Sequence, residues 1–273
     1  MEPYQPTENR ETGSATDGDA VPAQPQRTKG VDSARRVLQI LLQFNENTPE
    51  LTVENLLEDH DISVPSAYRY ISLLREMDLI EEREKGRFVL SPQVLRLARA
   101  AEASFDYRAK AQPILDRLAE TTGETSLYLR RVNDSAVCLA IAESDHPISI
   151  SFRPGNLMPL HSGAAAKVLL SDLSAAKLAQ YFQRVGPAIS KQARETLERD
   201  LDAIGVTGYA ESAAEVDQGV WASAAGIRVR DRLVGAVTVV APGYRLSEEN
   251  RGAIAVAVKA AAHELEGILA HFD

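Results

Sequence analysis

The segment 51–90 constrains the fold more than any other stretch of the chain. Two short runs within it, 51–57 and 64–74, carry apolar residues at helical spacing and are separated by a short polar turn. A run of alternating apolar and charged residues follows at 80–90, with Gly86 near its centre. Helical spacing followed by period-two alternation around a glycine is typical of two helices and a β-hairpin. We therefore predict a winged helix-turn-helix, in which the second helix enters the major groove of DNA.

The second of these helices has two different faces. Ala67, Ile71 and Leu74 recur at positions i, i+4 and i+7, so we expect them to pack on the first helix of the chain, which begins near Asp32. Hydroxyl, phenol and guanidinium groups on the other face suit base edges and phosphates. The predicted DNA-binding residues are Ser66, Tyr68, Arg69 and Ser72 on this helix, Arg35 and Arg36 on an earlier helix, and Lys85 and Arg87 in the hairpin. The alternative is an ordinary solvated face, and the segment 27–90 is not basic in sum, which counts against DNA binding.

The length, net charge and composition of the chain exclude several classes of protein. The chain has 273 residues, enough for two domains. Its net charge of −9 argues against a protein that coats nucleic acid nonspecifically. No apolar run approaches the roughly 20 residues that a membrane span requires, and no basic-then-apolar start predicts secretion. One cysteine and five histidines without zinc-type spacing predict neither a disulfide nor a metal site. We expect a cytoplasmic protein with no cofactor and no membrane contact.

The sequence pattern divides the chain into four parts. Residues 1–28 are polar and predict a disordered tail, and residues 29–91 hold the winged helix. Residues 92–105 form a helix rich in Leu and Ala, either a connector with a dimer contact or a packing helix of the next domain. Residues 106–273 contain two groups of strands, one of them including 148–152, with helices before, between and after them. This order predicts an α+β domain with a mostly antiparallel sheet covered by helices.

Trustworthy signatures of catalysis are missing. The sequence has no Gly-x-Ser-x-Gly elbow, no Walker loop and no His-Glu-x-x-His motif. His161 and Ser162 are adjacent, which rarely suits a base and its nucleophile, so we interpret His161 as a structural group. The small residues at 162–166 open a helix whose free N–H groups could receive an anionic ligand, although close helix packing explains them equally well.

Several short pieces of the chain together resemble one protein family. They are Val31 to Leu41, the helix 66–74, Arg153-Pro154-Gly155, Pro159-Leu160-His161, Gly208-Tyr209-Ala210, Glu215, Gly219-Val220 and Val239-Val240-Ala241-Pro242. In this order and spacing they resemble the IclR family of bacterial transcription regulators, over nearly everything after residue 28. The resemblance implies an N-terminal winged helix, a linker helix and a C-terminal effector-binding domain with a GAF-like fold. It also implies homodimers or dimers of dimers.

The resemblance further implies an effector pocket between the sheet and the small-residue helix start. By position its residues are Tyr128, Ile150, Met158, Ser162, Gly163, Ala164, Ser212, Ala222, Thr238 and Val240. Members that bind small acids are expected to have an acidic residue at 212, a cysteine at 222 and a hydroxyl at 240, whereas this chain has Ser, Ala and Val there. A polar ligand atom left without a partner costs about 1–3 kcal/mol. The exchanges therefore favour a less polar, larger or aromatic effector, or a pocket that is vestigial.

The leading interpretation is a transcriptional regulator that binds double-stranded DNA and is modulated by a small-molecule effector, an organic acid or an aromatic compound. One alternative is a GAF-like small-molecule enzyme with an accessory winged helix, and another is a scaffold that makes only protein contacts. The missing catalytic constellation favours the regulator, whereas the acidic balance of residues 27–90 favours the enzyme.

Overall fold

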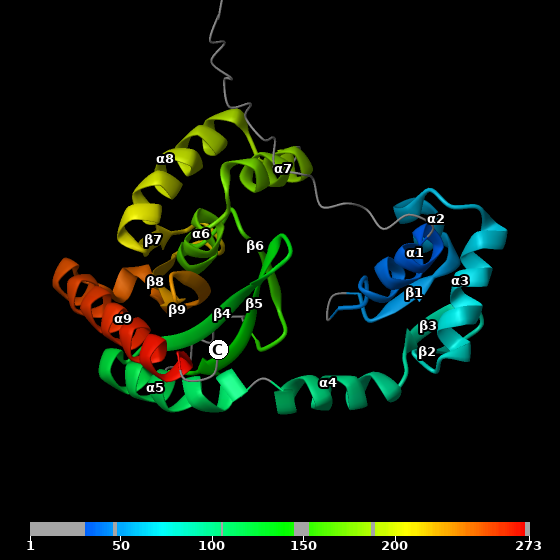
Figure 1. Ribbon diagram of the computed structural model, residues 1–273, viewed down its shortest axis with the longest axis horizontal. Helices are drawn as coiled ribbons and strands as arrows, with labels where there is room; N and C mark the ends of the chain where they lie inside the picture. Colours follow the sequence, from blue (N-terminus) through cyan, green and yellow to red (C-terminus); the bar gives the residue numbers. More distant parts are fainter. Residues whose placement is uncertain (1–30, 46–47, 105, 145–152, 187–188, 271–273) are drawn as a thin grey trace, which may run out of the picture.

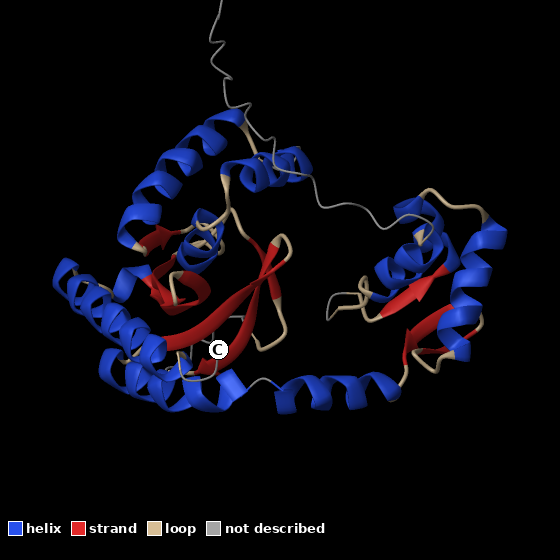
Figure 2. Ribbon diagram, viewed as in Figure 1, coloured by secondary structure: helices blue, strands red, loops and turns tan. Residues whose placement is uncertain are grey.

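The computed structural model describes residues 31–45, 48–104, 106–144, 153–186 and 189–270. Figure 1 shows two bodies of secondary structure with the helix α4 (Gln93–Ser104) between them. Each body combines helices with an antiparallel sheet, as the colours of Figure 2 show. The α+β class predicted from the sequence is therefore confirmed.

The N-terminal body consists of helices packed on a small sheet. Its helices are α1 (Asp32–Leu41), α2 (Val53–His60) and α3 (Val64–Glu76), and its strands are β1 (Glu50–Thr52), β2 (Ile80–Glu84) and β3 (Arg87–Leu90). The strands lie in the order β1-β3-β2, and both pairings are antiparallel. The sequence predicted the hairpin of β2 and β3 but not β1, because three residues are too few to show an alternating pattern.

Local sequence signals determine where α2 and α3 begin and end. Thr52 and Asn55 form a capping box: the Asn55 N–H donates to the Thr52 hydroxyl at 3.3 Å, and the Thr52 N–H donates to the Asn55 side-chain oxygen at 3.0 Å. Helix α2 ends at Asp61, which adopts the left-handed conformation with φ of 47°. Pro65 lies in the first turn of α3, where its missing N–H breaks no helical hydrogen bond. The short connection sets α3 directly after α2, as in a helix-turn-helix.

The apolar face of α3 anchors it in the core of this body. Ala67, Ile71 and Leu74 are 0%, 3% and 1% exposed, as their spacing predicted. The core around Ile71 and Leu74 is formed by Val37, Ile40, Leu51, Leu56, Tyr70, Ile80 and Phe88. Burying a side chain the size of Ile or Leu contributes roughly 1.5–3 kcal/mol. The opposite face of α3 is therefore not needed for anchoring and is left for other contacts.

The C-terminal body is organised on a six-stranded antiparallel sheet in the order β6-β5-β4-β9-β8-β7. Its strands are β4 (Thr125–Val132), β5 (Ser135–Ala142), β6 (Leu157–Pro159), β7 (Tyr209–Ala213), β8 (Val220–Val229) and β9 (Arg232–Pro242). The pairing of β4 with β9 joins segments that are far apart in the sequence. The strand predicted at 148–152 lies outside the described residues.

Helices cover both faces of this sheet (Figure 1). Helices α5 (Asp106–Thr122) and α9 (Glu248–Leu269) pack on one face, and a short 3-10 helix, η2 (Gly243–Arg245), precedes α9. Helices α6 (Ala164–Ser171), α7 (Ala175–Val185) and α8 (Lys191–Thr207) lie on the other face. Successive side chains of a strand point to opposite faces. Tyr128 therefore enters the core beneath α5 and α9, whereas Leu127 and Leu129 enter the core beneath α6.

Candidate functional site

The outer face of α3 carries residues that the sequence predicts to read DNA. Tyr68 is 54% exposed, and Arg69 and Ser72 are exposed beside it. The guanidinium of Arg69 lies 5.6 Å from the centre of the Tyr70 ring, within cation–π distance. Ser66 is half-buried near the start of the helix. Figure 1 shows α3 along the outer edge of the N-terminal body, where a large partner can reach it.

The wing, which is the hairpin of β2 and β3, carries cations among acidic neighbours. Arg87 lies 3.4 Å from Glu50 and 3.9 Å from Glu84. Lys85 is exposed at the tip of the hairpin. Exposed ion pairs are worth about 0–1 kcal/mol, so a phosphate group can compete with these carboxylates for Arg87.

The two arginines of α1 differ in their surroundings. Arg35 forms an ion pair with Asp32, one helical turn before it, and is half-buried. Arg36 is exposed. Because α1 packs against α3, these cations lie on the same small body as the wing and the outer face of α3.

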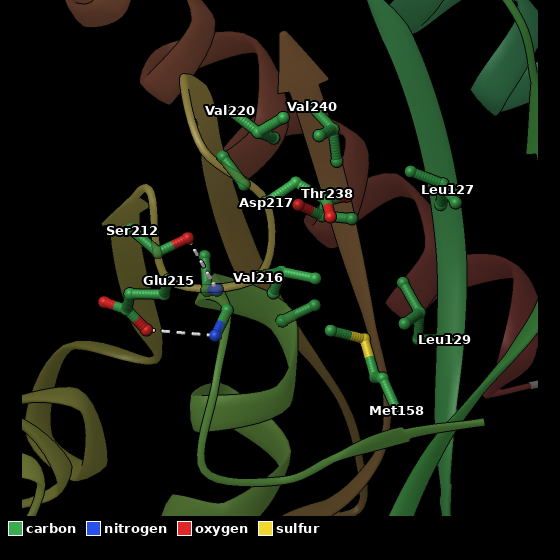
Figure 3. A pocket seen from close by; sticks show the side chains of 14 residues that line it. Leu127, Leu129, Met158, Ser212, Glu215, Val216, Asp217, Val220, Thr238 and Val240 are labelled. Atoms are coloured by element: carbon green, nitrogen blue, oxygen red, sulfur yellow. Dashed lines mark hydrogen bonds between the residues drawn. The ribbon is translucent and has the colours of Figure 1, made fainter. Parts of the chain in front are cut away.

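A mostly apolar cavity lies between the sheet and the start of α6 (Figure 3). Its empty volume is about 550 Å³, including space open to solvent. The cavity is lined by Leu127, Leu129, Met158, Gly163, Ala164, Ala165, Ser212, Glu215, Val216, Asp217, Val220, Ala222, Thr238 and Val240.

Gly163 brings the N-terminus of α6 against the wall of this cavity. Its φ of 91° and ψ of 148° form a conformation that other residues rarely adopt. A Cβ at this position would lie 3.0 Å from the Val216 side chain and 3.1 Å from the Met158 side chain. Both the backbone conformation and the close packing therefore require glycine at the point where the helix begins.

Side chains of the same molecule occupy the first N–H groups of α6. The Gly163 N–H donates to the carboxylate of Glu215 at 3.0 Å, and the Ala164 N–H donates to the hydroxyl oxygen of Ser212 at 3.0 Å, as the dashed lines in Figure 3 show. The other carboxylate oxygen of Glu215 accepts a hydrogen bond from the ammonium of Lys167 at 2.6 Å. Lys167 is only 4% exposed. The sequence suggested free N–H groups here, and two of them are instead satisfied internally.

Besides the carboxylates of Glu215 and Asp217, two hydroxyl groups give the cavity its polar character. Ser212 is 9% exposed and accepts from the Ala164 N–H, and its own proton has no acceptor within the described part of the chain. The hydroxyl of Thr238 donates to the Ser223 carbonyl at 2.8 Å, so its oxygen can still accept. The side chains of Ala222 and Val240 add only carbon atoms to the wall, unlike the cysteine and hydroxyl expected at these positions in acid-binding relatives.

Most residues that the family resemblance implied do line this cavity, namely Met158, Gly163, Ala164, Ser212, Ala222, Thr238 and Val240. Tyr128 does not, because strand alternation sends its side chain to the opposite face of the sheet, where it is fully buried. Ser162 does not either: it lies with His161 in a separate polar cleft, just before the helix turns inward at Gly163. Ile150 lies outside the described residues.

The sequence analysis missed several lining residues. Leu127 and Leu129 were missed because β4 is buried on both faces, so its pattern does not show which face holds the cavity. Glu215 and Val216 were missed because they lie in the loop after β7, where periodicity gives no signal. Glu215 belongs to the pieces that carried the family resemblance, and this was the one available signal for it.

His161 is held by Tyr181 rather than by its neighbour Ser162. Its Nδ1 lies 2.7 Å from the Tyr181 hydroxyl, and no hydrogen bond between His161 and Ser162 occurs among the described residues. Burial lowers the pKa of His161 below its ordinary value, and burial raises the pKa of Tyr181 to about 12. Both groups are therefore neutral near pH 7, which agrees with a structural role for the histidine.

Within the described residues, no group of three or more His, Cys, Asp and Glu side chains could hold a metal ion. In the same part of the chain, no helix is both long and apolar enough to cross a lipid bilayer.

Comparison with known proteins gives consistent matches. Residues 100–266 match a family model described as bacterial transcriptional regulator IclR C-terminal. The HTH-type transcriptional regulator KipR of Bacillus subtilis is 23% identical over 231 residues, which cover 82% of this chain and 92% of that protein. The crystal structure of an IclR-type transcriptional regulator from a Silicibacter species covers 87% of this chain and 96% of that chain, with 24% identity and a TM-score of 0.77. The crystal structure of an IclR homolog complexed with 4-hydroxybenzoate, from Microbacterium hydrocarbonoxydans, covers 86% and 98%, with 19% identity and a TM-score of 0.66.

Proposed function

We propose, because the chain belongs to the IclR family of bacterial transcriptional regulators, that it binds a specific double-stranded DNA operator under the control of a small molecule. The observation that carries the proposal is the division of α3 into two faces. Ala67, Ile71 and Leu74 are buried, whereas Tyr68 and Arg69 are exposed on the other side. A helix that is anchored by its apolar face and open on its polar face suits insertion into the major groove.

Each predicted DNA-binding residue has a role in this proposal. Ser66, Tyr68, Arg69 and Ser72 approach base edges and nearby phosphates from α3. The wing residues Lys85 and Arg87 and the α1 residues Arg35 and Arg36 contact the phosphate backbone. The net acidity of the chain is compatible with this, because what matters for a local reader is the placement of cations on one face.

We infer that the functional unit is a homodimer or a dimer of dimers on a pseudo-palindromic site. Helix-turn-helix proteins gain specificity by placing two reading helices on successive half-sites. Leu95 and Leu97 of α4 are 66% and 50% exposed, which supports a contact between copies at this helix. An effector that binds one dimer geometry more tightly than another shifts the population toward that geometry, and so changes the spacing of the reading helices.

We assign the parts of the chain accordingly. Residues 29–91 read DNA, residues 92–105 connect, and residues 106–273 bind the effector, with no catalytic step. The homolog from Microbacterium hydrocarbonoxydans complexed with 4-hydroxybenzoate supports a small organic compound as effector. Binding to chromosomal DNA implies a cytoplasmic protein.

The test begins with selection of bound DNA from a random pool at defined salt, which yields the operator. The Arg69→Ala variant should then bind it with about 1–3 kcal/mol less free energy, roughly 5- to 150-fold more weakly if the guanidinium reads a base. If Arg69 contacts a phosphate instead, the slope of log affinity against log salt should fall by about 1. The matched control is Arg232→Ala, which removes an exposed arginine from β9 and should leave operator affinity unchanged. An unchanged footprint and affinity for Arg69→Ala would show that α3 is not the reading helix.

A further inference from the structure

The wing contains an acidic residue, Glu82, that contacts both α3 and the tip of the hairpin. We propose that Glu82 is a positioning residue for DNA binding, which sets the distance between the outer face of α3 and the cation at the tip of the wing. It acts through Arg75 and Gly86 rather than through a contact of its own with DNA. This inference rests on the proposed function, because it concerns how the same winged helix meets its operator.

The carboxylate of Glu82 bridges the two parts with one oxygen each. The Arg75 guanidinium donates to one oxygen at 3.1 Å, and the Gly86 N–H donates to the other at 2.9 Å. Arg75 lies in the last turn of α3, and Gly86 lies in the turn between β2 and β3. Figure 1 shows this hairpin beside α3, so a single side chain joins the end of the proposed reading helix to the tip of the wing.

The alternation of β2 gives Glu82 its position. Glu82 pairs with Phe88 across the hairpin, and Phe88 is 3% exposed in the core that α3 helps to form. Residues directly opposite each other in an antiparallel pair point to the same face, so Glu82 lies on the side of the wing that faces α3. Glu81 points to the other side. It is exposed and forms no ion pair with another described residue.

The tip of the wing depends on this contact because the strand pairing is irregular just before it. The register shifts between Glu82 and Glu84, which interrupts the ladder of β2 and β3. Gly86 follows with a φ of 77°, and its neighbour Lys85 is exposed. The bond from the Gly86 N–H to Glu82 therefore orients the turn that carries Lys85.

The charge of Glu82 and its position affect DNA binding in opposite directions. A carboxylate on a DNA-binding body repels phosphate groups, so its removal alone should strengthen binding. Contacts to phosphate fix the register and orientation of a protein on the duplex, and Lys85 makes such a contact only if the hairpin holds the right distance from α3. We expect the effect of position to be the larger one, because it decides whether a cation of the wing reaches the backbone at all.

Titrations of the operator, obtained by the selection described above, separate the two effects in the full chain. Glu82→Ala removes both a charge and the bridge, whereas the matched control Glu81→Ala removes only a charge from the same strand. Glu82→Ala should bind at least about threefold more weakly than wild type, and its slope of log affinity against log salt should fall by about 1. Glu81→Ala should bind at least as tightly as wild type, because repulsion decreases.

A double-mutant cycle with Lys85 distinguishes positioning from a loss of stability. Lys85→Ala should weaken operator binding about threefold in the wild type and less than about 1.5-fold in the Glu82→Ala background, where the tip is no longer placed. A role in stability alone would lower the melting temperature and leave the effect of Lys85→Ala unchanged. Glu82→Gln keeps an oxygen for the Gly86 N–H but loses the charge that holds Arg75, so its affinity should be intermediate. This variant serves as the test if the alanine variant folds poorly.

Three outcomes would contradict the inference. Operator binding by both Glu82 variants at least as tight as that of wild type would show that lost repulsion, or an Arg75 released onto a phosphate, outweighs the position of the wing. An equal effect of Lys85→Ala in both backgrounds would show that Glu82 does not act through the tip. If the wild type bound no selected DNA, the proposed function would fail and this inference with it, whereas the first two outcomes leave the proposed function intact.

Discussion

Replacing Gly235 by alanine should destabilise the C-terminal body, because β9 has no room for a methyl group at this position. The new Cβ would lie 2.4 Å from Cε2 of Tyr128, 3.0 Å from the Tyr128 hydroxyl oxygen and 2.9 Å from the Leu129 carbonyl oxygen. Carbon atoms pack at about 3.5–4.0 Å, so the tyrosine ring must retreat by about 1 Å. Tyr128 is fully buried under α5 and α9, and Leu129 belongs to the ladder between β4 and β9. Neither group can move without disturbing the core or the sheet.

The size of the effect follows from the cost of overpacking, which is about 1–3 kcal/mol in a well-packed core. We expect about 2–3 kcal/mol, because one of the atoms in the way is a backbone oxygen. For a folded unit of this size each kcal/mol lowers the melting temperature by about 2–4 °C, so calorimetry should show a decrease of roughly 4–12 °C. The matched control is Gly252→Ala on the exposed side of α9, where nothing lies within 4 Å of the new Cβ. It should stabilise the protein by about 0.5–1 kcal/mol.

A second substitution identifies the cause of the loss. Tyr128→Ala removes the ring and should itself cost about 3–5 kcal/mol. In that background Gly235→Ala should cost about 0.5–3 kcal/mol less than it does alone, because the main obstacle has gone. A melting temperature for Gly235→Ala within about 1 °C of wild type, or strictly additive losses in the double variant, would refute the packing argument.

Two further predictions concern buried titratable groups. Burial raises the pKa of the Cys138 thiol to about 12, so the folded protein should not react with a thiol reagent near pH 8, and its reactivity in urea should follow unfolding; fast labelling of the native chain would contradict this. Burial also lowers the pKa of His161, so the unfolded state takes up a proton first as the pH falls through about 6.5, and the free energy of unfolding decreases below that pH. Urea titrations should show a smaller decrease for His161→Gln than for wild type, and identical pH profiles would disprove the assignment.

Sequence patterns located the elements of this chain better than they located its cavity. The apolar residues of α3 recur at helical spacing, and this spacing predicted the burial of Ala67, Ile71 and Leu74. A helix with one solvent-exposed face shows a clear periodicity in its sequence. In β4 the residues 125–129 are all buried, so no alternation indicates which face a given side chain joins. Tyr128 was therefore assigned to the cavity, although its side chain lies on the opposite face of the sheet and its neighbours Leu127 and Leu129 line the cavity.

The ends of segments set a second limit on what could be predicted. The glycine at 205 is a typical helix stop in the sequence, yet α8 continues through it and ends at Gly208, whose φ of 65° supplies the left-handed turn. Both glycines suit the role, and only tertiary contacts decide between them: the Gly226 N–H on β8 donates to the Gly208 carbonyl at 2.8 Å. The same dependence on distant partners hid the bond between Glu215 and the start of α6.

The outermost strands of the six-stranded sheet have a consequence for how copies of this chain meet. Among the strands of the described residues, β6 is the last on one side of the sheet, and it is three residues long and ends with Pro159, which has no N–H. On the other side it ends in β7, which is five residues long and carries the exposed carboxylate of Glu211. Short edge strands that contain a proline or a charged residue are poor templates for the addition of a further strand and for fibril growth. Concentrated protein should therefore associate through helices and loops, and an amyloid-like continuation of the sheet from one molecule to the next is disfavoured.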